Sequence, residues 1–250
     1  MNYIIDDNTK YFSEFIQCIK FLQNKIPIQF QHCNESNLIF QTEQLTRKIL
    51  FDIIIKYSYK NIILDYSMYN IHLLKKINNN SKTIICPIFF TDNMFFNINI
   101  KKYDIVFIGH LSDRRQNILN ELLKHGYTIL IIQNEYDFYK KYDLICSSKI
   151  LVNIHAYDDY RVYEFARCSI PIYNKVIVIS EECEGISEEL KNPINKFVIE
   201  HSIIVDYENI VQKCMNALVN YREPTIDYNN LRMITNTEIL RINAEIKEYE

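Results

Sequence analysis

A glycine and two adjacent arginines follow an apolar run in the stretch Gly109-His110-Leu111-Ser112-Asp113-Arg114-Arg115. Glycine lets the backbone approach a ligand closely, and the N-terminus of the helix predicted next offers free N–H groups and a partial positive charge. An arginine side chain binds phosphate or carboxylate through two parallel hydrogen bonds. The stretch could therefore hold an anionic ligand, with His110 and Ser112 alongside. The alternative is helix capping, by Asp113 paired with Gln116 or by Ser112.

Asn153 and His155 end the next apolar run two positions apart, so both side chains point to one face of the predicted strand. His155 could orient a phosphate or a sugar hydroxyl, or it could be a histidine hydrogen-bonded at a strand edge. Ser180 ends the following apolar run, where its hydroxyl could contact a diphosphate. Because Glu181 and Glu182 would repel such an anion, a solvent-facing loop is the alternative here.

Arg161, Glu164 and Arg167 are spaced three apart on a helix predicted over residues 158–170, which places them along one stripe. A carboxylate at the head of such a helix can accept hydrogen bonds from both hydroxyls of a ribose, as in dinucleotide sites. The alternative is a surface network of ion pairs, which contributes little to stability.

Two carboxylates of the first half come just after predicted strands. Asp65 ends the run Asn61-Ile62-Ile63-Leu64, and Glu43 follows the run at residues 37–41. In a cleft between two domains, burial would raise the pKa of such a carboxylate toward the range that suits a general base. Helix N-capping is the alternative role for both residues.

The composition describes a globular protein without a strongly basic face. Of its 250 residues, 48% are hydrophobic and 24% charged, and the net charge is −3, so neither nucleic acid nor an anionic membrane is an expected partner. The seven cysteines are scattered and form no C-x-x-C pair, which indicates a reducing compartment. No run approaches the ~20 apolar residues of a membrane span. Because the N-terminus also lacks signal-peptide features, we expect no transmembrane segment and a cytoplasmic location.

The sequence lacks the motifs of several catalytic designs. There is no H-E-x-x-H motif or cluster of Cys and His to predict a zinc site, and no G-x-x-x-x-G-K-[ST] loop or G-x-S-x-G elbow. No Asp-x-Asp triplet is present to hold a divalent ion. We therefore expect neither a metal site nor a resident cofactor.

Short apolar strands alternate with helical patterns, which is typical of parallel βαβ units and an α/β fold. We predict strands at residues 26–31, 37–41, 61–65, 83–87, 104–108, 127–132, 149–154 and 175–180, and helices at 8–24, 43–57, 67–77, 113–125, 135–146, 158–170, 206–221 and 229–247. Residues 91–102 show no clear helical or strand period, and we take them as the boundary between two domains. The predicted domains are residues 1–98 and 99–225, with a C-terminal helix in residues 226–250 that is expected to pack back on the first domain.

The second half resembles the donor-binding half of glycosyltransferases with the GT-B fold, in particular their spore-maturation-type branch. The resemblance lies in Asp104-Ile105-Val106-Phe107-Ile108-Gly109 with Arg114-Arg115, in Ser148–His155, in Arg161-Val162-Tyr163-Glu164 with Arg167, and in Val178-Ile179-Ser180-Glu181. The first half is similar to the shorter acceptor halves of this group at residues 39–45 and 64–67. In all, the resemblance spans about residues 25–220.

The resemblance implies two Rossmann-like halves facing a cleft, with the first half shortened. It implies transfer of a sugar from a nucleotide diphosphate to a hydroxyl of a glycan, protein or lipid, without an obligatory metal. Glu164 would bind the ribose, and Gly109 with its arginines would lie by the phosphates. The chain departs from the group in its short length, in Arg167-Cys168-Ser169 at a usually small position, and in lacking the glycine-rich acceptor-side loop. Two other functions stay open. The protein could bind a nucleotide sugar or glycan without catalysis, or it could be a different nucleotide-handling enzyme.

Overall fold

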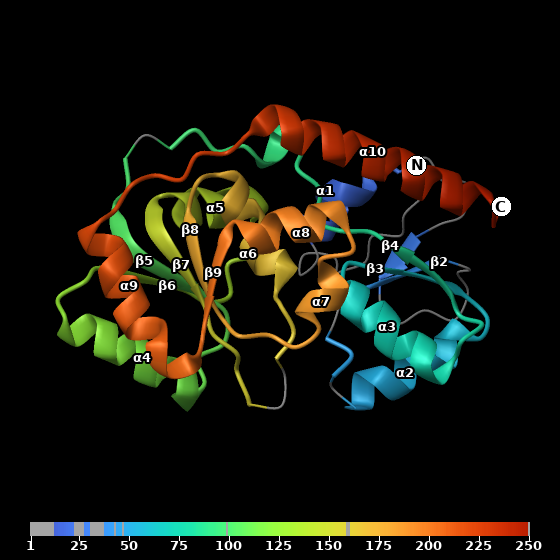
Figure 1. The fold of residues 1–250 in the computed structure, drawn as a ribbon, viewed down its shortest axis with the longest axis horizontal. Coiled ribbons are helices and arrows are strands. Elements are labelled where there is room, and N and C mark those ends of the chain that lie inside the picture. Colours follow the sequence, from blue (N-terminus) through green and yellow to red (C-terminus); the bar gives the residue numbers. More distant parts are fainter. Residues whose placement is uncertain are drawn as a thin grey trace. The chain divides into compact units, whose positions relative to one another are not determined.

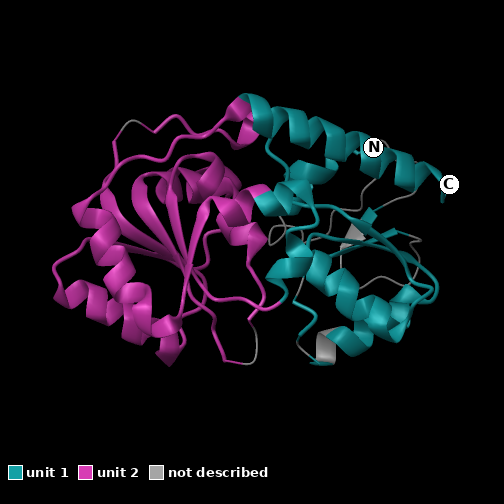
Figure 2. Ribbon diagram, viewed as in Figure 1, with its two compact units in different colours: residues 1–91, 185–196, 229–250 teal, residues 92–184, 197–228 magenta. Residues whose placement is uncertain are grey.

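The computed structural model describes residues 13–22, 28–30, 38–42, 44–46, 48–98, 100–158 and 161–249. The chain divides into two compact units, which Figure 2 shows in different colours. Unit 1 comprises residues 1–91, 185–196 and 229–250, and unit 2 comprises residues 92–184 and 197–228. Each unit is built around one parallel sheet.

The sheet of unit 1 has four parallel strands in the order β1-β2-β3-β4. Their bounds are β1 (Ile28–Phe30), β2 (Leu38–Gln41), β3 (Ile62–Asp65) and β4 (Lys82–Ile85). In the register of the sheet, Phe40 lies opposite Leu64, and Leu64 lies opposite Ile84. Every residue of β2 and β3 is buried, because helices cover both faces of a parallel sheet of this kind.

Helices cover the sheet of unit 1 on two sides. α2 (Lys48–Ser58) and α3 (Met68–Ile77) pack on one face, where Ile54 and Leu74 join Ile39 and Ile63 in a buried cluster. Figure 1 shows α1 (Ser13–Ile19) and α10 (Tyr228–Lys247) on the other side of this sheet. The short helix α7 (Ile186–Glu189) contacts α3.

The sheet of unit 2 has five parallel strands in the order β6-β5-β7-β8-β9. Their bounds are β5 (Tyr103–Ile108), β6 (Ile129–Ile132), β7 (Ser148–Asn153), β8 (Ile177–Glu181) and β9 (Ser202–Val205). Counted along the chain, this is the order 2-1-3-4-5 of flavodoxin-like sheets, in which ligands bind beyond the carboxyl ends of the first and third strands. Those strands are β5 and β7.

Helices also cover both faces of the unit 2 sheet. α4 (Asp113–Lys124) and α9 (Ile210–Val219) pack together over a buried cluster that includes Phe107, Leu122 and Cys214. α5 (Phe138–Cys146) and α6 (Phe165–Tyr173) pack on each other and on β7, on the side away from α4 and α9 (Figure 1). α8 (Pro193–Glu200) leads into β9, and the 3-10 helices η2 (Asp92–Met94) and η3 (Tyr207–Asn209) complete the elements of the described residues.

The predicted α/β class with Rossmann-like parallel sheets is confirmed. Three details differ from the sequence-based expectation. No element was expected between residues 181 and 205, where α7, α8 and β9 lie. α6 begins at Phe165 instead of near residue 158, because Val162 forms an isolated parallel bridge with Glu184 and keeps this segment out of the helix. The units divide after Thr91 instead of residue 98, and residues 185–196 belong to unit 1 together with most of α10.

Candidate functional site

Four residues singled out from the sequence meet at the carboxyl ends of β5 and β7. Gly109 directly follows β5, and its φ of +125° lies in the region that favours glycine. Asn153 is the last residue of β7. A Cβ atom placed on Gly109 would lie 3.2 Å from Nη2 of Arg167 and 3.7 Å from Nη1 of Arg115. Two guanidinium groups, one from α4 and one from α6, therefore border the backbone of Gly109.

Arg115 is held by backbone carbonyl groups. Its Nε donates a hydrogen bond to the carbonyl oxygen of Ile154, and its Nη1 donates to that of His110, both at 2.8 Å. The residue is only 4% exposed. Because carbonyl oxygens carry no net charge, these contacts orient the guanidinium without neutralising it. A buried positive charge is thus fixed between the ends of β5 and β7.

Arg167 is oriented by side chains of two neighbouring strands. Its Nη1 donates to Oδ1 of Asn153 at 2.7 Å, and Nδ2 of Asn153 donates to Oγ of Ser180 at 3.0 Å. Asn153 and Ser180 are fully buried. Ser180 therefore lies behind Asn153 and acts on the site through it, instead of offering its hydroxyl from a loop.

The two guanidinium groups form a region of surplus positive charge. Burial, and after it the charge of Arg167, lowers the pKa of Arg115 to about 10, while Glu164 acts in the opposite direction. Glu164 also forms an ion pair with Arg167, with 4.0 Å between Oε2 and Nη2. An anion bound between the two arginines would relieve their mutual repulsion.

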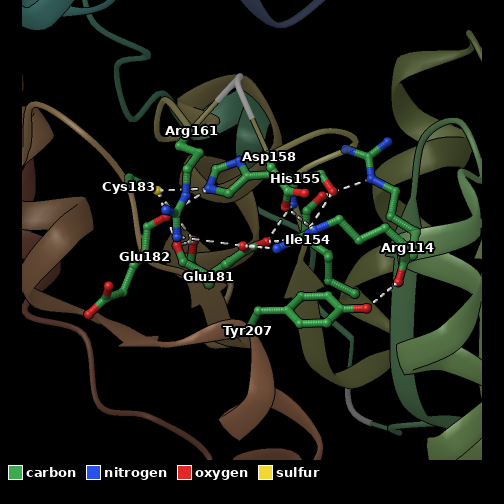
Figure 3. A network of polar contacts seen from close by, with 11 residues as sticks. Arg114, Ile154, His155, Asp158, Arg161, Glu181, Glu182, Cys183 and Tyr207 are labelled. Atoms are coloured by element: carbon green, nitrogen blue, oxygen red, sulfur yellow. Dashed lines mark hydrogen bonds and ion pairs between the residues drawn. The ribbon is translucent and has the colours of Figure 1, made fainter.

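Arg114 points into a separate cluster, drawn in Figure 3. Its Nη1 donates to Oε2 of Glu181 at 2.6 Å, and its Nη2 contacts Oε1 of the same, fully buried carboxylate. Its Nε donates to Oδ1 of Asp158 at 2.8 Å, and its guanidinium lies 3.8 Å from the centre of the Tyr207 ring. Of the two adjacent arginines, Arg115 is therefore the one that borders Gly109, and Arg114 serves Glu181.

The sequence reasoning did not anticipate the roles of Glu181 and Tyr207. From the sequence, Glu181 was seen only as a charge that would oppose a diphosphate near Ser180, but it is the last residue of β8 and is paired with Arg114. A carboxylate at the end of a predicted strand was a partial sequence signal for such an ion pair. Tyr207 also donates from its hydroxyl to the carbonyl oxygen of Arg114 at 2.8 Å, and no motif pointed to it.

Ser112, and not Asp113, occupies the N-cap position of α4. Its side chain makes no capping hydrogen bond, and its buried Oγ has no hydrogen-bond partner among the described residues. The first N–H groups of α4 therefore lack a cap from this side chain. His110, beside it, is exposed and contributes its carbonyl oxygen to Arg115.

The spacing had predicted that Arg161, Glu164 and Arg167 share one helix. In the structure, Arg167 lies in α6, and Arg161 and Glu164 precede its first residue. Glu164 is the N-cap residue of α6, makes no side-chain capping bond there, and has a side chain that is 23% exposed. Arg161 precedes it in extended chain, with its Nη2 4.0 Å from Oε1 of Glu181. Glu164 thus stands at the head of a helix beside Arg167, while Arg161 borders the cluster of Arg114.

His155 lies just past the end of β7 and is 2% exposed. Its backbone N–H donates to Oε2 of Glu181 at 3.0 Å, and its Nε2 lies 2.9 Å from the carbonyl oxygen of Glu182. The residue therefore links the ends of β7 and β8. Figure 3 shows the imidazole near Arg161 and Cys183.

Asp65 lies in unit 1, at the end of β3, and is 1% exposed. Its Oδ1 accepts hydrogen bonds from the N–H of Ser67 at 2.9 Å and from Nδ2 of Asn70 at 3.1 Å. These contacts hold the carboxylate beside the N-terminal end of α3, where Ser67 is the N-cap residue, so Asp65 does not itself take the capping role that the sequence had left open. Burial raises the pKa of Asp65 well above its ordinary value. Glu43 lies outside the described residues, so catalysis by either carboxylate stays a prediction.

A hollow of about 390 Å³ lies elsewhere on unit 2, along β9 and α9. Its lining is mostly polar, with Glu182, Asp206 and Lys213 as the charged residues, and none of the predicted site residues lines it. Within the described part of the chain, no three His, Cys, Asp or Glu side chains gather as metal ligands would. None of the described helices is both long and apolar enough to span a bilayer.

The chain is similar to proteins of Acanthamoeba polyphaga mimivirus. The uncharacterized protein R358 of this virus is 32% identical over 234 residues, which cover 90% of the present chain and 79% of R358. The chain belongs to the family of R358. No family model matches it.

Two further mimivirus proteins are similar to this member of the R358 family. The uncharacterized protein L137 is 30% identical over 220 residues, which cover 84% of the chain but only 29% of L137. The uncharacterized protein L140 is 30% identical over 196 residues, which cover 76% of the chain and 62% of L140. In L137, the segment that resembles the R358 family is therefore part of a much longer protein.

Proposed function

We propose that the protein binds a nucleotide sugar by its diphosphate at the ends of β5 and β7 and transfers the sugar to a hydroxyl of a glycan, protein or lipid. The observation that carries this proposal is the convergence of Arg115 and Arg167 on Gly109. It occurs where sheets with this strand order bind their ligands. Guanidinium groups match the geometry and charge of phosphate oxygens. The proposal includes a GT-B-like pairing of the two halves.

The two arginines also suit the chemistry of a metal-independent transfer. When the bond to the sugar breaks, the departing diphosphate gains negative charge, and fixed donors aimed at that charge lower the barrier. Arg115 is fixed by two carbonyl groups and Arg167 by Asn153. They would supply the positive charge that a divalent cation supplies in other transferases. The N-terminus of α4 adds N–H groups at the same edge.

Glu164 is proposed to bind the ribose of the same ligand. Its side chain is partly exposed at the head of α6 and lies beside Arg167. A ribose attached to a diphosphate at Arg167 would therefore be close to this carboxylate. Two acceptor oxygens suit the two ribose hydroxyls.

A second candidate function is binding of a nucleotide sugar or glycan without catalysis. The observation that favours it concerns Asp65, whose carboxylate accepts hydrogen bonds from Ser67 and Asn70 at the start of α3 and is almost inaccessible. A general base must reach the proton of the acceptor. If Asp65 only holds the start of α3 in place, unit 2 would still bind the nucleotide sugar, but the protein would lack the proposed general base.

The proposed cytoplasmic location fits the state of the thiols. The six cysteines in the described ranges, Cys18, Cys86, Cys146, Cys168, Cys183 and Cys214, are all free. Five of them are buried and behave as small core residues. A reducing compartment keeps such thiols in this form.

Calorimetry with ADP, GDP, UDP and dTDP in the presence of a chelator tests the proposal. The wild type should bind at least one of them, and Arg167→Gln should weaken that binding about tenfold or more, because a charge-assisted contact is lost. Lys124→Gln, which removes an equal charge from the exposed end of α4, is the matched control and should bind as the wild type does. Absence of binding by the wild type, or equal binding by both variants, would contradict the proposed site.

A further inference from the structure

The imidazole of His155 is buried, and within the described residues only one of its two nitrogens has a hydrogen-bond partner. Its Nε2 lies 2.9 Å from the carbonyl oxygen of Glu182, and the residue is 2% exposed. Its Nδ1 is buried and has no hydrogen-bond partner within the described ranges. Buried polar atoms in folded proteins are nearly always paired, so an unpaired ring nitrogen calls for an explanation.

The protonation state of the ring follows from its surroundings. Burial lowers the pKa of His155, which is therefore neutral at pH 7, although the charge of Glu181 acts in the opposite direction. The carbonyl oxygen of Glu182 can only accept a hydrogen bond, so Nε2 must carry the proton. In a neutral imidazole the other nitrogen, Nδ1, is then a pure acceptor.

Among the described residues, no other group near the ring is arranged to donate to Nδ1. Cys183 lies at the other nitrogen, 3.6 Å from Nε2, and its thiol donates to the carbonyl oxygen of Glu181. Arg161 borders the same cluster, but its guanidinium is directed to the carboxylate of Glu181. The side chain of Arg161 is 39% exposed, so this edge of the cluster borders solvent.

We propose that Nδ1 of His155 accepts a hydrogen bond from a hydroxyl group of the bound nucleotide sugar. This inference rests on the proposed function, because it assigns the ligand that occupies the same edge of the sheet. The ring follows β7 by two residues, and Glu164 and Arg114 both act on it electrostatically. The ring therefore lies near the proposed diphosphate site, but it would bind a different group of the ligand.

The ligand group that Nδ1 contacts must be a hydrogen-bond donor, because Nδ1 can only accept. Phosphate oxygens at neutral pH act as acceptors, as Nδ1 does, and the two would repel each other. A hydroxyl has the required proton and is present on the ribose and on the transferred sugar. His155 would thus select for hydroxyl groups, while Arg115 and Arg167 select for negative charge. A site built to bind a hydroxyl strongly disfavours an analogue that lacks it.

Two variants separate the nitrogens of the ring. In His155→Gln the side-chain amide reaches the position of Nε2 and can still donate to Glu182, but no atom replaces Nδ1. In His155→Asn the shorter side chain places its oxygen near the position of Nδ1 and loses the contact with Glu182. We expect His155→Gln to bind the nucleotide sugar about tenfold more weakly than the wild type, the usual effect of one hydrogen bond. His155→Asn should bind within a fewfold of the wild type.

Three ligands identify the hydroxyl. The ribonucleoside diphosphate with the highest affinity is compared with its 2′-deoxy form and with its glucose ester, and inorganic pyrophosphate serves as the control. A loss in His155→Gln for the nucleoside diphosphate, but not for its deoxy form, assigns the ribose. A loss for the glucose ester alone assigns the sugar. Pyrophosphate should bind equally to the wild type and both variants.

Nitrogen NMR of the imidazole tests the same contact in the unaltered protein. Titration with the glucose ester should shift the Nδ1 resonance of His155 in the direction of an accepted hydrogen bond, and pyrophosphate should leave it in place. An unshifted resonance, or a folded His155→Gln that binds every ligand as the wild type does, would overturn the inference. If the wild type binds no nucleoside diphosphate, the proposed function falls as well. If Arg167→Gln weakens binding and His155→Gln does not, only the present inference falls.

Discussion

Arg167 donates a hydrogen bond from Nη1 to Oδ1 of Asn153 at 2.7 Å, and this contact joins the first turn of α6 to the last residue of β7. It leaves Nη2 beside Gly109, where a Cβ atom would approach it to 3.2 Å. The guanidinium is therefore held in place before a ligand arrives. Preorganised groups lose less conformational freedom on binding, so the contact favours affinity as well as position.

Gly109→Ala should disturb this arrangement. Alanine at a φ of +125° is strained, and its methyl group would push against Arg167, so we expect a loss of about 1–3 kcal/mol in unfolding free energy and weaker binding of a nucleoside diphosphate. Gly126→Ala is the matched control, because it has a φ of +82° with nothing within 4 Å of the new methyl group. It should be destabilised and still bind normally. Equal affinities of the two variants would show that Gly109 does not border the ligand.

Arg114→Ala should act on stability more than on binding. It leaves the fully buried carboxylate of Glu181 without its bidentate partner, and breaking such a pair costs about 3 kcal/mol or more. Urea unfolding measures the change, with the exposed Lys124→Ala as control. Adding Glu181→Gln should recover part of the loss, because glutamine keeps an acceptor for the N–H of His155 without the charge. A double variant no more stable than Arg114→Ala would contradict this role.

Glu164→Gln should have opposite effects on two ligands. If Glu164 holds the ribose, the variant binds a nucleoside diphosphate more weakly by about 1–3 kcal/mol, since charge-assisted hydrogen bonds are lost. Inorganic pyrophosphate should bind more tightly, because a negative charge near Arg167 is removed. Calorimetry with both ligands decides the matter. If both bind more tightly, Glu164 is an ion-pair partner of Arg167 and not a ribose ligand.

The positions of Gly109 and Asn153 at strand ends, and of arginines in the helices that follow, could be predicted because they depend on local pattern. Each lies at the end of an apolar run or in the helix that follows, and parallel strands bring such ends to one edge. The choice between Arg114 and Arg115 could not be predicted. It depends on the pairing of β8 beside β7, which brings Glu181 within reach of Arg114.

The missed elements have a physical reason of their own. Between α8 and β9 only His201 intervenes, so the apolar residues of a helix run directly into those of a strand. Neither the helical nor the strand period is then sustained long enough to be recognised. The role of Asp65 was ambiguous for another reason. A carboxylate after a strand suits a cap and a base equally, and the structure places Ser67 at the N-cap of α3, with Asp65 accepting a hydrogen bond from its N–H.

Asp65 should make the stability of the protein depend on pH. Burial foremost, with the charge of Glu189 in addition, raises the pKa of Asp65 well above its ordinary value of 3.8. A group with a raised folded-state pKa stabilises the fold below its unfolded value, and this stabilisation is lost as the pH rises through the folded value. Asp65→Asn keeps an acceptor for Ser67 and Asn70 and should be less sensitive to rising pH. Its melting temperature relative to wild type should therefore increase from pH 4 upward, whereas the exposed Asp52→Asn should show no such trend.

Asp65→Asn also separates an enzyme from a binding protein. The proposed transfer, if inverting, requires a base for the acceptor hydroxyl, and loss of a general base lowers turnover by ~10²–10⁴-fold. The assay is release of nucleoside diphosphate from a nucleotide sugar in chelator, with wild type and variant at equal saturation.

Because asparagine retains an acceptor for Ser67 and Asn70, a fall in turnover with unchanged donor affinity would assign catalysis to Asp65. If Asp65→Asn and Glu43→Gln both turn over normally, neither carboxylate is the base, and a retaining mechanism without a protein base is the better account. If the wild type binds a nucleotide sugar tightly and releases nothing above background with glycan, protein or lipid acceptors, the protein is a binding module.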